Sequence, residues 1–247
     1  MPNHPTVELP VLALGPAQPM QGRALAPPLR GLTILAVEDS RFASEALRLM
    51  CNRLGARLRR AETLSAAHSH LRLYRPDLVI VDLGLPDGRG EALIREIVLR
   101  NPRGPVILGT SGDAAGRASA LAAGADGFLD KPLESFSAFR TTIARHLPDP
   151  MTGPPDAPDT PLTHDTLALR DDLAHAAALI EAGTDAAGQA YVTGFLSGVA
   201  RHAHDAVLAE AVLLGQSRDG NLTQLAHLLR DRLNAPAPAF ASTPQAR

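Results

Sequence analysis

Residues 31–147 alternate short apolar segments with stretches in which apolar residues recur at helical spacing. The short segments are 33–37, 57–62, 77–82, 106–110 and 127–130. The helical stretches are Ser40–Leu54, Thr63 to near Tyr74, 91–99, 114–123 and 134–146. The segment DLVIVD at 77–82 is almost wholly apolar, as a strand covered on both faces should be. Strands that alternate with helices on short loops predict an α/β fold with a doubly wound, five-stranded parallel sheet.

Proline clusters divide the chain into parts. Prolines crowd residues 1–30 and 148–162 without strand or helix periodicity, so we expect a disordered N-terminal tail and a semi-stiff linker. Residues 31–147 then form one domain, residues 163–235 a second, and residues 236–247 a disordered C-terminal tail. The second domain shows helical periodicity alone. It predicts two or three amphipathic helices, too few to bury their apolar stripes without a partner surface.

Composition is that of an ordinary soluble protein. The 247 residues are 45% hydrophobic and 20% charged, and the net charge of −2 favours neither nucleic acid nor an anionic membrane. No apolar run reaches the roughly 18 residues that span a bilayer, and the N-terminus lacks the pattern of a signal peptide. Cys51 is the only cysteine, which excludes an internal disulfide. We therefore expect a cytoplasmic protein.

Acidic residues close two of the predicted strands. Glu38 and Asp39 follow the first strand, and Asp82 ends the third. In the flavodoxin-like strand order 2-1-3-4-5 these strands are neighbours, and their carboxyl ends meet at the point where ligands bind. Clustered carboxylates favour a hard divalent cation such as Mg²⁺, which would also offset the charge of a phosphoryl group in transfer. Asp82 ends the most apolar strand and is the candidate nucleophile for an aspartyl phosphate.

The two remaining strand ends supply a hydroxyl and an ammonium group. Thr110 ends the fourth strand and offers a neutral donor for a phosphoryl oxygen, although an ordinary helix cap is the alternative. Lys131 ends the fifth strand and is the only lysine of the chain. An ammonium is a compact point charge, unlike the planar guanidinium of arginine. We therefore predict that Lys131 contacts the phosphoryl group.

These motifs together resemble the receiver domain of two-component response regulators. The matching segments are EDS (38–40), VDLGLPDG (81–88), GTSGD (109–113) and FLDKPL (128–133). The resemblance covers about residues 31–147. It implies a phosphoacceptor protein, not an enzyme with a separate substrate, that is bacterial and receives its phosphoryl group from a sensor histidine kinase or a phosphotransfer protein.

The resemblance also implies a role for each matching residue. The Mg²⁺ site would comprise Glu38, Asp39, Asp82 and the backbone carbonyl of Gly84. Asp39 would be the direct ligand of the acidic pair, and Asp82 the phosphoacceptor. Thr110 would be the switch hydroxyl and Lys131 the phosphate-binding lysine. Phe128 stands where Tyr is common, at the aromatic position that swings inward on activation.

The helical residues 163–235 leave three alternatives open. The first is an atypical DNA-binding output, against which five arginines beside nine acidic residues argue. A phosphotransfer-like bundle is the second alternative, because histidines occur at His175, His202, His204 and His227. The third is homodimerisation or docking of a protein target, favoured by small residues at Ala200, Ala203, Ala206, Ala209 and Ala211. An output enzyme would need a longer chain.

Overall fold

The computed structural model describes residues 27–101, 103–133, 135–147, 165–216 and 222–235. Most of the predicted N-terminal tail, the linker 148–162 and the C-terminal tail 236–247 lie outside these ranges. Residues 27–30 were assigned to the tail by their composition, yet they pack against the domain. Leu29 is buried, and its backbone N–H donates to the carbonyl of Leu54 at 2.8 Å. The packed domain therefore includes residues before 31, a correction to the predicted boundary.

Five strands form one parallel sheet in the order β2-β1-β3-β6-β7. They are β1 (Thr33–Val37), β2 (Arg57–Ala61), β3 (Leu78–Asp82), β6 (Val106–Ser111) and β7 (Gly127–Asp130). This is the predicted order 2-1-3-4-5, so the flavodoxin-like fold is confirmed. Every residue of β3 is buried, as its apolar sequence predicts. The turn after β3 contains a short antiparallel pair, β4 (Gly84–Leu85) and β5 (Gly88–Arg89).

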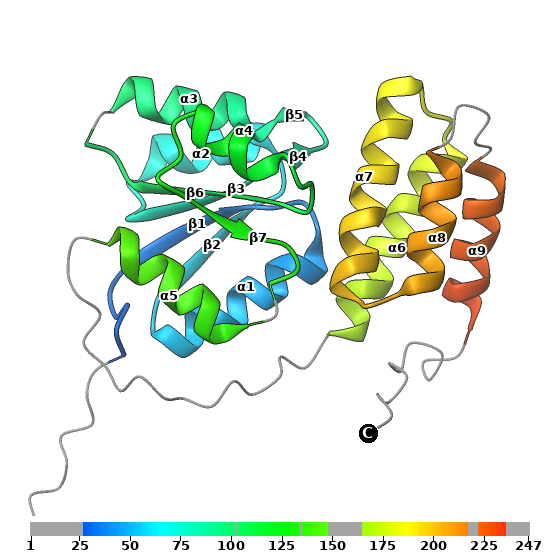
Figure 1. The fold of residues 1–247 in the computed structure, drawn as a ribbon, viewed down its shortest axis with the longest axis horizontal. Coiled ribbons are helices and arrows are strands. Elements are labelled where there is room, and N and C mark those ends of the chain that lie inside the picture. Colours follow the sequence, from blue (N-terminus) through cyan, green and yellow to red (C-terminus); the bar gives the residue numbers. More distant parts are fainter. Residues whose placement is uncertain (1–26, 102, 134, 148–164, 217–221, 236–247) are drawn as a thin grey trace, which may run out of the picture.

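Helices cover both faces of the sheet (Figure 1). Helices α1 (Arg41–Leu54) and α5 (Phe136–His146) pack on one face. Helices α2 (Leu64–Leu73), α3 (Gly90–Arg100) and α4 (Gly116–Ala122) pack on the other. Side chains of Ser40, Thr63 and Ser135 accept backbone N–H groups at the starts of α1, α2 and α5, so local capping chemistry sets where these helices begin.

The C-terminal region contains four helices in the described residues, where two or three were predicted. They are α6 (Thr166–Glu181), α7 (Ala186–His202), α8 (Ala206–Gly215) and α9 (Leu222–Asn234). Apolar residues continue in the sequence beyond His202, but the chain breaks there. His204 has a φ of 52°, and the Asp205 side chain accepts the N–H of Leu208 at 2.9 Å. The cap at Asp205 therefore starts a new helix although the apolar stripe continues.

These four helices bury an apolar core between themselves. Its fully buried members include Leu173, Val192, Leu196, Leu208 and Leu229. The expectation that the helices need an outside partner is therefore only partly right, since the partner is the same chain: Phe42 of α1 joins this core. Ala200, Ala203, Ala209 and Ala211 also belong to it or pack against it. Among the described helices, none combines the length and apolar character that crossing a bilayer requires.

Candidate functional site

The three predicted carboxylates meet where β1 and β3 end. These strands pair in parallel with Val37 beside Val81, so the residues that follow come to the same edge of the sheet. One carboxylate oxygen from each of Glu38, Asp39 and Asp82 lies within 4.8 Å of the others. Glu38 is 1% exposed and Asp82 8%, so little water reaches their charges. We call these three residues the acidic cluster.

Lys131 lies inside the acidic cluster, not in solvent. Its Nζ is 2.6 Å from Oε2 of Glu38 and 2.8 Å from Oδ2 of Asp82, and its side chain is 7% exposed. Burial alone would lower the pKa of Lys131, but the carboxylates of Asp82 and Glu38 outweigh burial and raise it. The ammonium therefore stays charged and bridges the two carboxylates.

One ammonium does not neutralise three carboxylates. Burial raises the pKa of Glu38, the Lys131 ammonium opposes this shift, and Asp82 and Asp39 add repulsion. Burial also raises the pKa of Asp39 to about 6, again with repulsion from Asp82. Hard divalent cations bind carboxylate oxygens whose negative charge is not balanced by neighbouring cations. The chemistry of the acidic cluster therefore fits a metal ion.

Thr110 and Phe128 lie on β6 and β7, the two strands that follow β3 in the sheet. Thr110 pairs in register with Asp82, is fully buried, and its hydroxyl has no hydrogen-bond partner among the described residues. A buried polar atom without a partner is uncommon, and this hydroxyl is available to donate to a ligand atom. Phe128 is 5% exposed, and the guanidinium carbon of Arg117 lies 5.2 Å from its ring centroid. The ring of Phe128, the predicted switch residue, is thus buried in this structure.

Two positioning residues escaped the sequence reasoning. Arg60 of β2 donates from Nη2 to the carbonyl of Asp39 at 2.9 Å and from Nε to the carbonyl of Glu38 at 3.3 Å, so it holds the backbone of the acidic pair. Gly90 begins α3 against the carbonyl of Asp82, where a Cβ would overlap that oxygen. The alternation of polar residues in β2 was the available signal for Arg60.

The helical region also reaches the acidic cluster. Tyr191 of α7 donates its hydroxyl to Oδ2 of Asp39 at 2.6 Å. Burial, followed by the nearby Asp39 carboxylate, raises the pKa of Tyr191, so the phenol keeps its proton. The two residues are 152 positions apart, and no local pattern pointed to this contact.

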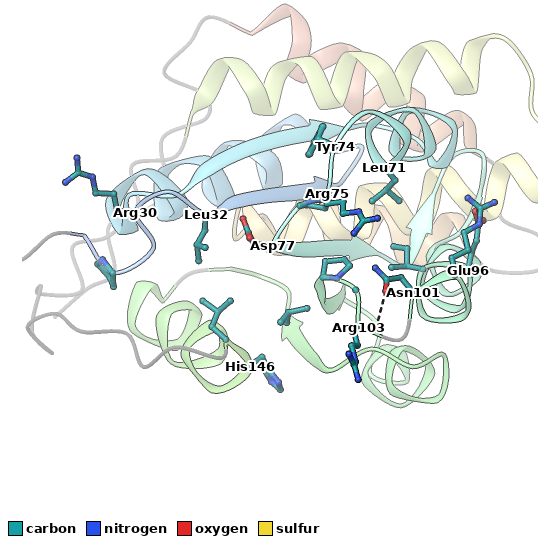
Figure 2. A pocket seen from close by; sticks show the side chains of 18 residues that line it. Arg30, Leu32, Leu71, Tyr74, Arg75, Asp77, Glu96, Asn101, Arg103 and His146 are labelled. Carbon is teal, nitrogen blue, oxygen red and sulfur yellow. Dashed lines mark hydrogen bonds and ion pairs between the residues drawn. The ribbon is translucent and has the colours of Figure 1, made fainter.

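A cavity of about 840 Å³ lies elsewhere, where Leu32, Asp77 and Val106 precede or begin strands (Figure 2). Its rim carries Arg30 and Arg103. None of its lining residues belongs to the predicted site. In doubly wound folds, ligands bind at the carboxyl ends of the strands, so the acidic cluster and not this cavity is the candidate site.

Part of the chain matches a known protein family. The protein-family model described as "Response regulator receiver domain" matches residues 34–143. The chain is 34% identical over 125 residues to the KDP operon transcriptional regulatory protein KdpE of Escherichia coli (strain K12), covering 48% of this chain and 56% of that protein. It is 33% identical over 102 residues to the probable transcriptional regulatory protein TcrX of Mycobacterium tuberculosis, covering 41% and 44%. The chain thus spans about half the length of the curated relatives it matches.

Solved structures with similar folds include a putative response regulator from Chloroflexus aurantiacus. It has 27% sequence identity and a TM-score of 0.43, over 46% of this chain and 95% of that one. The family match, the strand order and the acidic cluster agree with one another. Residues 34–143 of this chain are therefore a response regulator receiver domain, which a helical C-terminal region follows.

Proposed function

We propose that this chain is the response regulator of a two-component phosphorelay. Asp82 accepts a phosphoryl group from a phosphohistidine of a sensor histidine kinase or phosphotransfer protein, and the helical region carries the output. The observation that supports this most is the environment of Asp82. Its carboxylate lies 2.8 Å from the buried ammonium of Lys131, and its register partner on β6, Thr110, has a buried hydroxyl without a partner in the described chain. Both groups would bind phosphoryl oxygens.

Each step of the transfer uses a group at this site. A carboxylate oxygen of Asp82 attacks phosphorus, the P–N bond of the donor breaks, and its electron pair stays on the imidazole nitrogen, which takes up a proton. The Lys131 ammonium exchanges the Asp82 carboxylate for a phosphoryl oxygen as its partner, and the Thr110 hydroxyl donates a hydrogen bond to another phosphoryl oxygen. Mg²⁺ held by the acidic cluster and the Gly84 carbonyl would supply positive charge to the phosphoryl oxygens.

The proposed output is protein interaction through the helical region, as a homodimer or with a target. Helix α8 leaves Val207 59% and Leu213 67% exposed, and apolar side chains in such positions favour a protein partner. The acidic charge of this region disfavours DNA. A phosphotransfer role is also disfavoured, since the side chain that reaches the acidic cluster is a phenol, Tyr191, while His202 is buried and accepts the N–H of Leu133 at 3.1 Å.

Labelling with acetyl phosphate tests the phosphoacceptor function. We expect intact-mass spectrometry to show one phosphoryl group per chain when Mg²⁺ is present, and none when EDTA removes it. Borohydride reduction followed by peptide mapping should place the label in the peptide that contains Asp82. A label on another residue, or one that forms equally well in EDTA, would refute the proposal.

The two acidic residues after β1 should differ in their effect on Mg²⁺ binding. Asp39→Ala removes the proposed direct ligand and should weaken Mg²⁺ binding by roughly a hundredfold, whereas Glu38→Ala should weaken it by about tenfold, as loss of an outer ligand partner does. Glu38 already uses its oxygens on Lys131 and on the N–H of Ser40, which is why the smaller effect is expected. Calorimetric titration measures both, and equal losses would contradict the assignment.

A further inference from the structure

Helix α7 contacts the loops that surround the acidic cluster. Tyr191 near its start binds Asp39, which follows β1. The same helix contacts β4, the segment after β3 that contains Gly84. Figure 1 shows α7 beside the edge of the receiver domain where these loops lie. Two of the four loops that surround Asp82 are therefore in contact with α7.

The far end of α7 touches the other two loops. Nη1 of Arg201 donates to the carbonyl of Gly112 in the loop after β6, where the absence of a Cβ leaves room for the guanidinium. Nε2 of His202 accepts the N–H of Leu133 in the loop after β7. One helix thus contacts all four loops of the site, and Asp82 in that site is 8% exposed.

Helix α6 also contacts the receiver domain, next to the acidic cluster. The buried carboxylate of Asp172 accepts the hydroxyl of Ser40 at 2.7 Å and the backbone N–H groups of Arg41 at 2.8 Å and Phe42 at 3.1 Å. It therefore caps α1, the helix that begins directly after the acidic pair. A side chain of the helical region completes a receiver helix, so the two parts of the chain are built to fit one another.

Tyr191 and a metal ion would both interact with the unbalanced negative charge of the acidic cluster. The acidic cluster has one ammonium for three carboxylates, and in the docked arrangement the Tyr191 hydroxyl gives Asp39 a short hydrogen bond of 2.6 Å. A divalent cation attracts the same carboxylate oxygens far more strongly and brings waters that need the space in front of them. We propose that α7 and the metal ion occupy the acidic cluster in alternation, so that the helical region closes the metal-free receiver and is released when the site is loaded.

This gating rests on the proposed function, since it assumes that the acidic cluster binds Mg²⁺. Coupling between two binding events is reciprocal: whatever Mg²⁺ does to docking, docking does to Mg²⁺ affinity by the same factor. A phosphodonor protein would likewise have to displace α7 to reach Asp82. Weaker docking should therefore raise both Mg²⁺ affinity and the rate of labelling.

Tyrosine fluorescence tests whether Tyr191 leaves Asp39. The chain has two tyrosines and no tryptophan, so Tyr74→Phe leaves Tyr191 as the single tyrosine. Tyr74 contacts His70 on α2 and lies outside the acidic cluster. A carboxylate acceptor quenches phenol emission, so Mg²⁺ should raise the emission of Tyr191 along a saturable curve. Emission that stays constant while calorimetry records Mg²⁺ binding would overturn the proposal.

Mg²⁺ affinity in two variants gives the second test. Tyr191→Phe removes the competing hydrogen bond to a charged group and should tighten Mg²⁺ binding by about tenfold, while Tyr74→Phe, the matched control, should leave it unchanged. Arg201→Ala loosens α7 at its other end, away from the cluster, and should tighten binding by a smaller factor. Weaker or unchanged binding in Tyr191→Phe would mean that Tyr191 only positions Asp39, and the alternation would be wrong.

The two proposals fail differently. If acetyl phosphate labels Asp82 with Mg²⁺ but Tyr191→Phe leaves Mg²⁺ affinity unchanged, the receiver function stands and the gating falls. If the parent chain binds no Mg²⁺ and takes no label, the proposed function falls and the gating falls with it.

Discussion

Asp82→Asn is expected to abolish Mg²⁺-dependent labelling by acetyl phosphate, to the level seen in EDTA. Asparagine keeps the size of the side chain but is no nucleophile toward phosphorus and brings no negative charge to a metal ion. Asp82 is also the carboxylate that Lys131 and Thr110 flank, so no other acid of the cluster has its surroundings. Intact-mass spectrometry measures the loss.

A second strand-end acid supplies the control for this variant. Asp130 ends β7 and is exposed, with an ion pair to Arg117 at its surface. Asp130→Asn should therefore be labelled like the parent chain. Undiminished labelling of Asp82→Asn, with its fold verified by circular dichroism, would show that another residue accepts the phosphoryl group.

Lys131→Met is expected to lower the free energy of unfolding by about 3 kcal/mol when no divalent cation is present. Methionine fills a similar volume but leaves the buried carboxylates of Glu38 and Asp82 without the cation that now lies 2.6 and 2.8 Å from them. Removing one partner of a buried ion pair costs much more than an exposed pair would, because the remaining charge has no water to solvate it. Urea unfolding in EDTA measures the loss.

Added Mg²⁺ should restore part of the stability of Lys131→Met, because it supplies positive charge to the same oxygens. Lys131→Arg is the companion variant, since it keeps the charge and should lose less stability in EDTA. An Lys131→Met chain as stable as the parent without metal would show that the acidic cluster is neutralised in some other way.

Much of the receiver domain followed from local sequence. The apolar run of β3 predicts a strand covered on both faces. The alternation of strands with helices allows few topologies, because crossovers between parallel strands are right-handed. Given that topology, the ends of β1, β3, β6 and β7 must meet at one edge. The sequence therefore predicts that Glu38, Asp39, Asp82 and Lys131 lie together, as they do in the structure.

The helical region was predicted less well, for a physical reason. An amphipathic stripe indicates a helix and its buried face, but it does not say which surface covers that face. The break at His204 depended on the cap at Asp205, which competed with a continuing apolar pattern. As a result, four helices stand where two or three were expected.

The contact between the two parts of the chain was decided by tertiary structure alone. Tyr191 meets Asp39 across 152 positions, and Asp172 meets Ser40 across 132. In sequence, Tyr191 is an aromatic residue at the start of an amphipathic helix, and Asp172 is an acid of a kind usually left in solvent. Each gains its role when α6 and α7 pack on α1, because only then does a hydrogen-bond partner come within reach. The sequence by itself thus determined the receiver fold and the composition of its acidic cluster, and the packing of the helices decided what covers it.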